Sequence, residues 1–478
     1  MHKSLLLKLF LFLITIAGCI DGPIEPAATP PYTEETPMET PVETTLEPAP
    51  ETTIPPTPIP TTTIPPTTPP PTPQAREMSF EDSHFGFMHP EQSYEEAAEL
   101  NVHWSRPHPG PFVWHEVEVE RGRYDWRRAD EFVKRAQSYE FNLLATIWPF
   151  ADWDQANCRT MLPRDKAEDF MELGKYRSRP CDMVAYEEFV KKVVERYDGD
   201  GYNDMPGLLY PIKYWEVSNE PSMQEELVFF NGLPEDYFDV LKTTYLAVKE
   251  ADPNAIVLHG GIAGFGGDGA EKFWQRVLDL GGSNYFDIAN HHSIGDGEDI
   301  HIPAMKAFLN KNGVSKPMWM PELEFAARGL GRDRISEDEW AEILVKTFVY
   351  AFGEGEDKLF YVGLDLSPGD PESWFLYVEK SGYTGEMGPK KKQAPFYAFR
   401  TMVEKIDYFT EVEKMAVGQY KFTVDGASVY VLWGSGSLPQ EIAGKVRVTD
   451  INGNEKDVDA SSVVLTGSPI FVETASDG

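Results

Sequence analysis

Two segments of the sequence place carboxylates where an apolar run ends. The first, YWEVSNEPSM at 214–223, closes on Asn219, Glu220 and Pro221. Proline cannot continue strand pairing, so the side chain of Glu220 is aimed at whatever lies beyond the strand. The second segment, PMWMPELEF at 317–325, carries Glu322 and Glu324, which share one face of an extended strand. At most one of these two is expected to react.

Two carboxyl groups that face each other can cleave a glycosidic bond. At a separation of about 5 to 5.5 Å they act as acid/base and nucleophile of a retaining glycosidase, and at about 6.5 to 9.5 Å as an inverting pair. Apolar neighbours are expected to raise the pKa of Glu220 by desolvation, as a proton donor working near neutral pH requires. The sequence by itself leaves the separation open.

The elements that must position these residues alternate along the chain. Eight apolar segments are predicted to be strands: 84–88, 102–106, 142–148, 212–217, 255–260, 286–292, 317–322 and 358–366. Stretches of helical period lie between them, among them 127–140, 185–197 and 337–352. No Gly-rich dinucleotide fingerprint follows the first strand, so the pattern favours a (β/α)8 TIM barrel over a doubly wound sheet. Residues at the carboxyl ends of its strands would face the active-site mouth.

The segments WEVSNEP and WMPELE, taken together, resemble the fourth- and seventh-strand signatures of clan GH-A glycoside hydrolases. Segment 101–136 and the NLLATIWPFADW that follows at 142–153 look like the second and third units of barrels related to family 39. The resemblance covers about residues 80 to 475. It implies a (β/α)8 retaining enzyme.

Carried over residue by residue, the resemblance implies that Glu220 is the acid/base and Glu322 the nucleophile. Asn219 would bind the sugar 2-hydroxyl, Arg106 would keep the nucleophile ionised, and His292, rather than His291, would line the sugar site. The sequence departs from the family where Ile294 stands in place of a tyrosine, and where no tryptophan ends the eighth strand.

Aromatic side chains near strand ends and in rim loops suit the apolar face of a pyranose. We therefore predict substrate contacts, beside those above, for Trp104, Trp148, Trp153 and Trp374. No Cys, His and Asp spacing indicates a catalytic metal, and no cofactor is expected. Cys158 and Cys181 are the two cysteines of the predicted folded part, and the sequence leaves open whether they form a disulfide.

The chain is predicted to have four parts. Residues 1–19 have the form of a signal peptide, and IAGC at 16–19 resembles a lipoprotein signal that would leave Cys19 lipidated; a plain secretory signal is the alternative. A Pro/Thr-rich stretch at 20–77 cannot bury a core and is expected to be an extended linker. A catalytic barrel at 78–406 and a β-sandwich domain at 407–478 follow, the latter divided by turn signals such as Asp425-Gly426.

The net charge is −35, from 43 basic and 78 acidic residues. Such a surface repels phosphate backbones, so nucleic acid is not an expected partner and a carbohydrate is. The sequence predicts an extracellular, lipid-anchored retaining glycoside hydrolase. Two alternatives remain: a carbohydrate-binding surface protein that kept the fold without turnover, and a transglycosylase with the same residues. Neither the sugar, the linkage nor the oligomeric state can be predicted.

Overall fold

The computed structural model describes residues 80–167, 170–224, 227–265, 269–324, 335–362, 364, 376–380 and 387–474. The predicted signal peptide with Cys19, the linker and Trp374 lie outside these residues. Within them, no helix has both the length and the apolar character needed to cross a bilayer.

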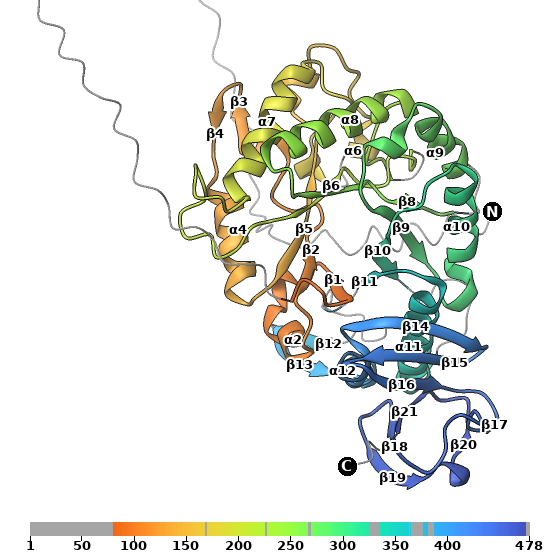
Figure 1. Ribbon diagram of the computed structural model, residues 1–478. Helices are drawn as coiled ribbons and strands as arrows, with labels where there is room; N and C mark the ends of the chain where they lie inside the picture. Colours follow the sequence, from red (N-terminus) through yellow and green to blue (C-terminus); the bar gives the residue numbers. More distant parts are fainter. Residues whose placement is uncertain are drawn as a thin grey trace, which may run out of the picture. The chain divides into compact units, whose positions relative to one another are not determined.

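The described residues form a parallel barrel of eight main strands, as predicted (Figure 1). These strands are β1 (Phe85–Met88), β2 (Trp104–Arg106), β5 (Asn142–Ile147), β6 (Tyr214–Val217), β7 (Ile256–His259), β9 (Ala289–Ile294), β10 (Met318–Glu324) and β11 (Lys358–Val362). A ninth, short strand, β8 (Ile262–Ala263), continues from β7 and pairs with β9. A bridge between Leu258 and Ile288 also joins β7 to the start of β9, so the sheet closes on itself.

Two glycines between β7 and β8 let the backbone pass close to Val217 and His292. A Cβ atom on Gly260 would lie 2.4 Å from the carbonyl oxygen of Val217. Gly261 has a φ of 54°, and a Cβ there would lie 2.4 Å from the ring of His292. Only glycine combines this left-handed backbone with such a close approach.

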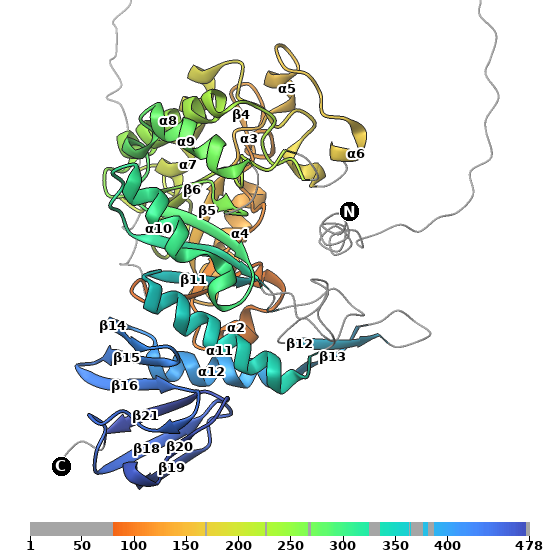
Figure 2. The ribbon, with the colours of Figure 1, turned by 90° about the vertical axis from the view of Figure 1, so that its right-hand side faces the viewer.

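The helices lie outside the strands (Figures 1 and 2). The long helices are α4 (Arg127–Ser138), α7 (Met183–Tyr197), α8 (Pro234–Ala251), α9 (Ala270–Asp279), α10 (Ile302–Lys311), α11 (Glu337–Glu354) and α12 (Ala394–Ile406). Shorter elements are α2 (Tyr94–Glu99), α3 (Trp114–Val117), α5 (Asp152–Gln155), α6 (Arg164–Ala167), the pair β3 (Glu118–Glu120) and β4 (Arg123–Tyr124), and the hairpin β12 (Leu376–Lys380) and β13 (Met387–Lys392). The three helical stretches predicted from periodicity are confirmed as α4, α7 and α11. Side-chain caps from Asp182 and Ser336 begin the last two.

A small antiparallel β domain follows α12, as predicted. Its six-stranded sheet contains β14 (Phe409–Ala416), β15 (Gln419–Val424), β16 (Ala427–Leu432), β21 (Ile470–Thr474), β18 (Lys445–Asp450) and β19 (Glu455–Asp459) in spatial order. A two-stranded sheet adds β17 (Gly436–Ser437) and β20 (Val464–Leu465). The Asp425-Gly426 turn joins β15 to β16, and both of its residues have positive φ.

Polar contacts fix this domain to the amino-terminal side of the barrel. The carboxylate of Asp407 accepts hydrogen bonds from the Ser83 hydroxyl at 2.7 Å and the His84 amide at 2.8 Å. Lys405 of α12 forms ion pairs with Glu455 and Glu473. The contacts of Asp407 are with the residues just before β1, so the domain packs away from the strand ends that carry the candidate site.

Candidate active site

Five predicted site residues meet at the carboxyl ends of four strands. Arg106 ends β2, Asn219 and Glu220 follow β6, His292 lies on β9 and Glu322 on β10. All five are buried, with at most 6% of each residue exposed. The strand register pairs Glu322 with His292, and partners in parallel strands face the same side of a sheet. The sequence prediction that these residues come together is therefore matched by the geometry.

Arg106 is the hub of this group. Its Nε and Nη2 donate to the two oxygens of Glu216, each at 3.0 Å, and its Nη1 donates to Oε2 of Glu322 at 3.0 Å. Nη2 also donates to Oδ1 of Asn219 at 2.6 Å. Burial disfavours the charged guanidinium, but the two carboxylates outweigh it and raise the pKa of Arg106. One fixed cation therefore orients both Glu322 and Asn219.

Glu216 is a site residue that the sequence analysis missed. It lies in the middle of β6, and its oxygens also accept hydrogen bonds from the Thr146 hydroxyl and the Asn290 amide, each at 2.6 Å. Burial would raise the pKa of Glu216, but Arg106 and His292 outweigh burial and lower that pKa to about 2. The available signal was a charged residue inside an otherwise apolar strand, since such a residue is rarely buried without a partner.

Glu220, Glu322 and His292 are in direct reach of one another. The His292 Nδ1 lies 2.9 Å from Oε1 of Glu220 and 3.6 Å from Oε2 of Glu322. One carboxylate oxygen of Glu220 lies within 4.8 Å of one of Glu322. Oxygens this close fit the roughly 5 to 5.5 Å between the carboxyl groups of retaining glycosidases better than the roughly 6.5 to 9.5 Å that leaves room for a water in inverting enzymes.

The electrostatics of this group differ from residue to residue. Burial, and then the charge of Glu322, raise the pKa of Glu220 above its usual range, while His292 opposes the shift. For His292, burial lowers the pKa, but the hydrogen bonds to Glu216 and Glu220 and the charge of Glu322 outweigh it and raise the pKa to about 9. Glu220 is thus favoured as the protonated carboxyl of the pair, in the predicted direction.

The backbone after β6 is strained where it delivers Glu220. Ser218 and Glu220 have φ angles of 63° and 37°, in a region that costs other residues than glycine about 1–3 kcal/mol each. Hydrogen bonds hold the turn: the Ser218 amide donates to the Ile147 carbonyl at 2.9 Å, and the Tyr237 hydroxyl donates to the Val217 carbonyl at 3.1 Å. This strained turn aims the carboxylate across the mouth.

Trp104 is not in the site, contrary to the sequence prediction. It points into the barrel like Arg106, but two residues earlier on β2 and therefore nearer the amino ends of the strands. It is fully buried there, with ring centroids 5.5 Å from Trp319 and 6.1 Å from Phe360, and Lys358 Nζ lies 4.3 Å from its ring centroid. Trp104 therefore builds the barrel floor and cannot reach a sugar.

The predicted contact of Trp148 with a sugar is also wrong, whereas that of Trp153 stays a prediction. Trp148 is fully buried, and its Nε1 donates to the Pro109 carbonyl at 2.6 Å. Trp153 is half-buried, and its Nε1 donates to the Glu118 carbonyl at 2.9 Å. Both indole N–H groups hold rim segments together, and part of the Trp153 ring stays exposed. Trp374 lies outside the described residues.

The adjacent residues His291 and His292 of β9 point to opposite sides of the sheet. His291 points away from the site, with its Nδ1 3.3 Å from a buried oxygen of Glu356, so it is His292 that lies beside Glu220. His108 was missed: it is 5% exposed, and its Nδ1 is buried without a hydrogen-bond partner in the described part of the chain. Burial, with the charges of Arg106, His89 and His292, holds the pKa of His108 well below its usual range, so it is a neutral imidazole beside the group.

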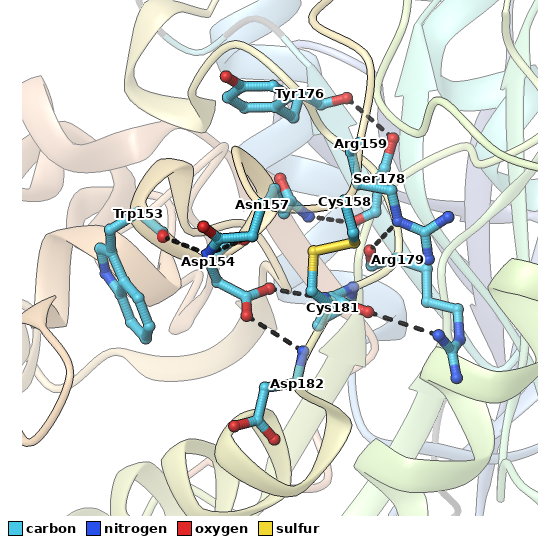
Figure 3. Close-up of a disulfide and its surroundings, with 12 residues drawn as sticks. Trp153, Asp154, Asn157, Cys158, Arg159, Tyr176, Ser178, Arg179, Cys181 and Asp182 are labelled. Carbon is cyan, nitrogen blue, oxygen red and sulfur yellow. Dashed lines mark hydrogen bonds between the residues drawn. A yellow bond between two sulfur atoms is a disulfide. The ribbon is translucent and has the colours of Figure 1, made fainter.

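A disulfide lies in the segment between β5 and α7 (Figure 3). This segment begins at the carboxyl end of β5. Cys158 and Cys181 are bonded, with their Cα atoms 5.9 Å apart. The Asp154 carboxylate accepts hydrogen bonds from the amides of Cys181 at 2.6 Å and Asp182 at 3.1 Å. The bond that the sequence left open therefore ties this segment to the start of α7.

Similar proteins were found among solved structures. A family 39 glycoside hydrolase from Bacteroides cellulosilyticus WH2 is 16% identical, with a TM-score of 0.56 over 82% of this chain and 80% of that one. A family 39 β-xylosidase from Caulobacter crescentus is 14% identical, with a TM-score of 0.53 over 84% and 98%. The catalytic domain of the family 30 xylanase C from Talaromyces cellulolyticus is 14% identical, with a TM-score of 0.51 over 85% and 99%.

No protein-family model and no curated protein matches the sequence. The structural likenesses span most of the chain and are shared between glycosidase families, whereas the identities are too low to carry a substrate across. The chain therefore has the fold of the clan GH-A glycoside hydrolases, as the two carboxylate motifs predicted.

Proposed function

We propose that the protein is a retaining glycoside hydrolase that cleaves O-glycosidic bonds of an extracellular oligo- or polysaccharide. The observation that carries this proposal is the close approach of Glu220 and Glu322 beside the cation Arg106. A glycosidase fold supports the same conclusion. The net charge of −35 favours a neutral polymer over nucleic acid as the partner.

In this mechanism Glu322 attacks the anomeric carbon while Glu220 gives its proton to the leaving oxygen. Glu220 then takes a proton from the water that releases the sugar from Glu322. Arg106 holds Glu322 ionised through its Nη1 hydrogen bond. The Asn219 Nδ2 has no hydrogen-bond partner within the described residues, so it is free to donate to the sugar 2-hydroxyl.

The test is a screen of chromogenic glycosides and polysaccharides, followed by the stereochemistry of the first product. Proton NMR of the fresh product is expected to show the anomeric configuration of the substrate, because two displacements restore it. A first product of opposite configuration would exclude the covalent route. Binding of a glycan without any cleavage would favour the carbohydrate-binding alternative.

Glu216 is expected to support catalysis through Arg106 without touching the sugar. Glu216→Ala leaves the buried guanidinium short of its main partner, and breaking a buried pair costs about 3–5 kcal/mol of unfolding free energy. Glu216→Gln keeps the shape, but it loosens Arg106 and so misplaces Glu322, and kcat is expected to fall about 10²-fold. Thermal melts and steady-state kinetics measure the two effects.

Glu118→Gln is the matched control, because Glu118 is equally buried but its carboxylate contacts residues outside the site: it accepts hydrogen bonds from Trp114 and Gly122 and lies 4.0 Å from Arg121. Its kcat should stay near the wild-type value even where its melting temperature falls. Unchanged kcat in Glu216→Gln would reduce Glu216 to a structural residue.

We further propose that the protein is anchored outside the cell through lipid on Cys19. The support is the IAGC motif and the Pro/Thr-rich stretch behind it. Wild-type protein is expected to partition into detergent in a Triton X-114 phase separation, and Cys19→Ala to stay in the aqueous phase or unprocessed. Equal partitioning of the two forms would contradict the anchor.

A further inference from the structure

Glu220, His292 and Glu322 also form a compact set of metal-binding side chains. One ligand atom from each lies within 4.8 Å of the other two, and each residue is more than nine-tenths buried. Their positions along the chain show no ligand spacing, because they come from three different strand ends. The sheet topology alone brings an imidazole and two carboxylates to one point.

The dimensions of this set suit a small transition-metal ion. Bonds of about 2.0–2.2 Å to a tetrahedral ion place its ligand atoms about 3.3–3.6 Å apart. The His292 Nδ1 lies 2.9 Å from Glu220 and 3.6 Å from Glu322, and the two carboxylates lie within 4.8 Å of each other, so side-chain movements that bring the carboxylates together would complete the site. Mixed nitrogen and oxygen ligands suit Zn²⁺ or Cu²⁺, whereas Ca²⁺ and Mg²⁺ prefer larger sets of oxygens.

The surroundings also fit a dication. Arg106 lies 3.0 Å from Glu322 and would repel an ion, but Glu216 neutralises the guanidinium with two hydrogen bonds. Asn219 is 1% exposed, and its Nδ2 has no hydrogen-bond partner within the described part of the chain. A zinc ion with three protein ligands keeps a fourth position for water, and this amide is a donor that such a water can accept from.

We propose that Glu220, His292 and Glu322 bind one divalent transition-metal ion of the Zn²⁺ class, and that the ion inhibits the enzyme. Inhibition follows because the ion occupies both carboxylates that must react, so metal and substrate exclude each other. The inhibition rests on the proposed function, but the binding does not.

The test is isothermal titration calorimetry of the full-length protein with zinc chloride, with magnesium chloride as the reference. We expect one Zn²⁺ per chain and at least tenfold weaker binding in His292→Gln, with circular dichroism melts to verify folding. Two controls remove carboxylate or imidazole elsewhere: Asp200→Asn, in the separate group of Asp198, Asp200 and Asp204, and His89→Gln, an exposed histidine. Both should bind zinc like the wild type.

Copper binding can be measured without calorimetry, because Cu²⁺ is paramagnetic. Electron paramagnetic resonance of the protein with one equivalent of Cu²⁺ should show coupling to a histidine nitrogen, and this signal should be lost in His292→Gln. Equal binding by wild type and His292→Gln, loss of binding in Asp200→Asn, or no binding up to about 1 mM zinc would overturn the proposal.

Activity separates this inference from the proposed function. With a cleavable aryl glycoside, zinc should inhibit competitively and EDTA should restore the rate. Zinc binding at these residues in a protein that cleaves no glycoside would refute the proposed function alone. If the protein hydrolyses the glycoside but neither binds zinc nor is inhibited by it, this inference alone is refuted.

Discussion

Glu322→Ala is expected to abolish turnover of every substrate, including aryl glycosides with good leaving groups. The reason is that the covalent route needs a carboxylate at this place, and no other step replaces the bond to the anomeric carbon. The loss should therefore exceed the roughly 10²- to 10⁴-fold effect of removing a general acid or base. Stopped and continuous assays of nitrophenol release measure this loss of turnover. Release by Glu322→Ala should stay at the background level and show no initial burst.

Labelling identifies the nucleophile directly, because a 2-fluoro glycoside should trap Glu322 and peptide mass spectrometry should locate the label. Glu324 is the natural control, two residues further along β10. Burial, and then the charge of Glu322, raise the pKa of Glu324 to about 7, so its carboxyl is poorly prepared to attack as an anion. A label on Glu324 would move the nucleophile and leave the retaining mechanism intact.

The barrel could be predicted because its strands and helices repeat a simple pattern. Each strand segment is a short apolar run bounded by polar residues, and all eight are strands in the structure. Asn219 and Glu220 could be placed at a rim because Pro221 ends the strand pairing directly after them. Residues at strand ends are thus the part of a site that sequence position reveals.

Depth inside the barrel could not be predicted in the same way. Trp104 and Arg106 point in the same direction, but two residues along β2 separate the floor from the reactive layer. Glu216 was hidden because its partner Arg106 lies 110 positions earlier in the chain. Such pairs depend on which strands are neighbours and at what register, and hydrophobic periodicity carries no information on either.

Glu220→Ala is expected to show a different pattern, in which the loss depends on the leaving group. Substrates with poor leaving groups need a proton from Glu220, so kcat/KM should fall about 10²- to 10⁴-fold. Aryl glycosides with acidic phenols need no proton to depart, and their first step should survive. Added azide should then restore turnover by replacing the water that Glu220 would have activated, and should yield a glycosyl azide of retained configuration.

The pH profile gives the same assignment independently. Burial and the charge of Glu322 raise the pKa of Glu220, so its protonated form persists above the usual carboxyl range. As pH rises through that pKa the acid loses its proton, and kcat/KM of the wild type should fall on this alkaline limb. The limb should vanish in Glu220→Ala assayed with a good leaving group. If the limb stays in place, or azide fails to restore turnover, another group supplies the proton, and His292, whose pKa is raised to about 9 and which lies 2.9 Å from Glu220, is the next to replace.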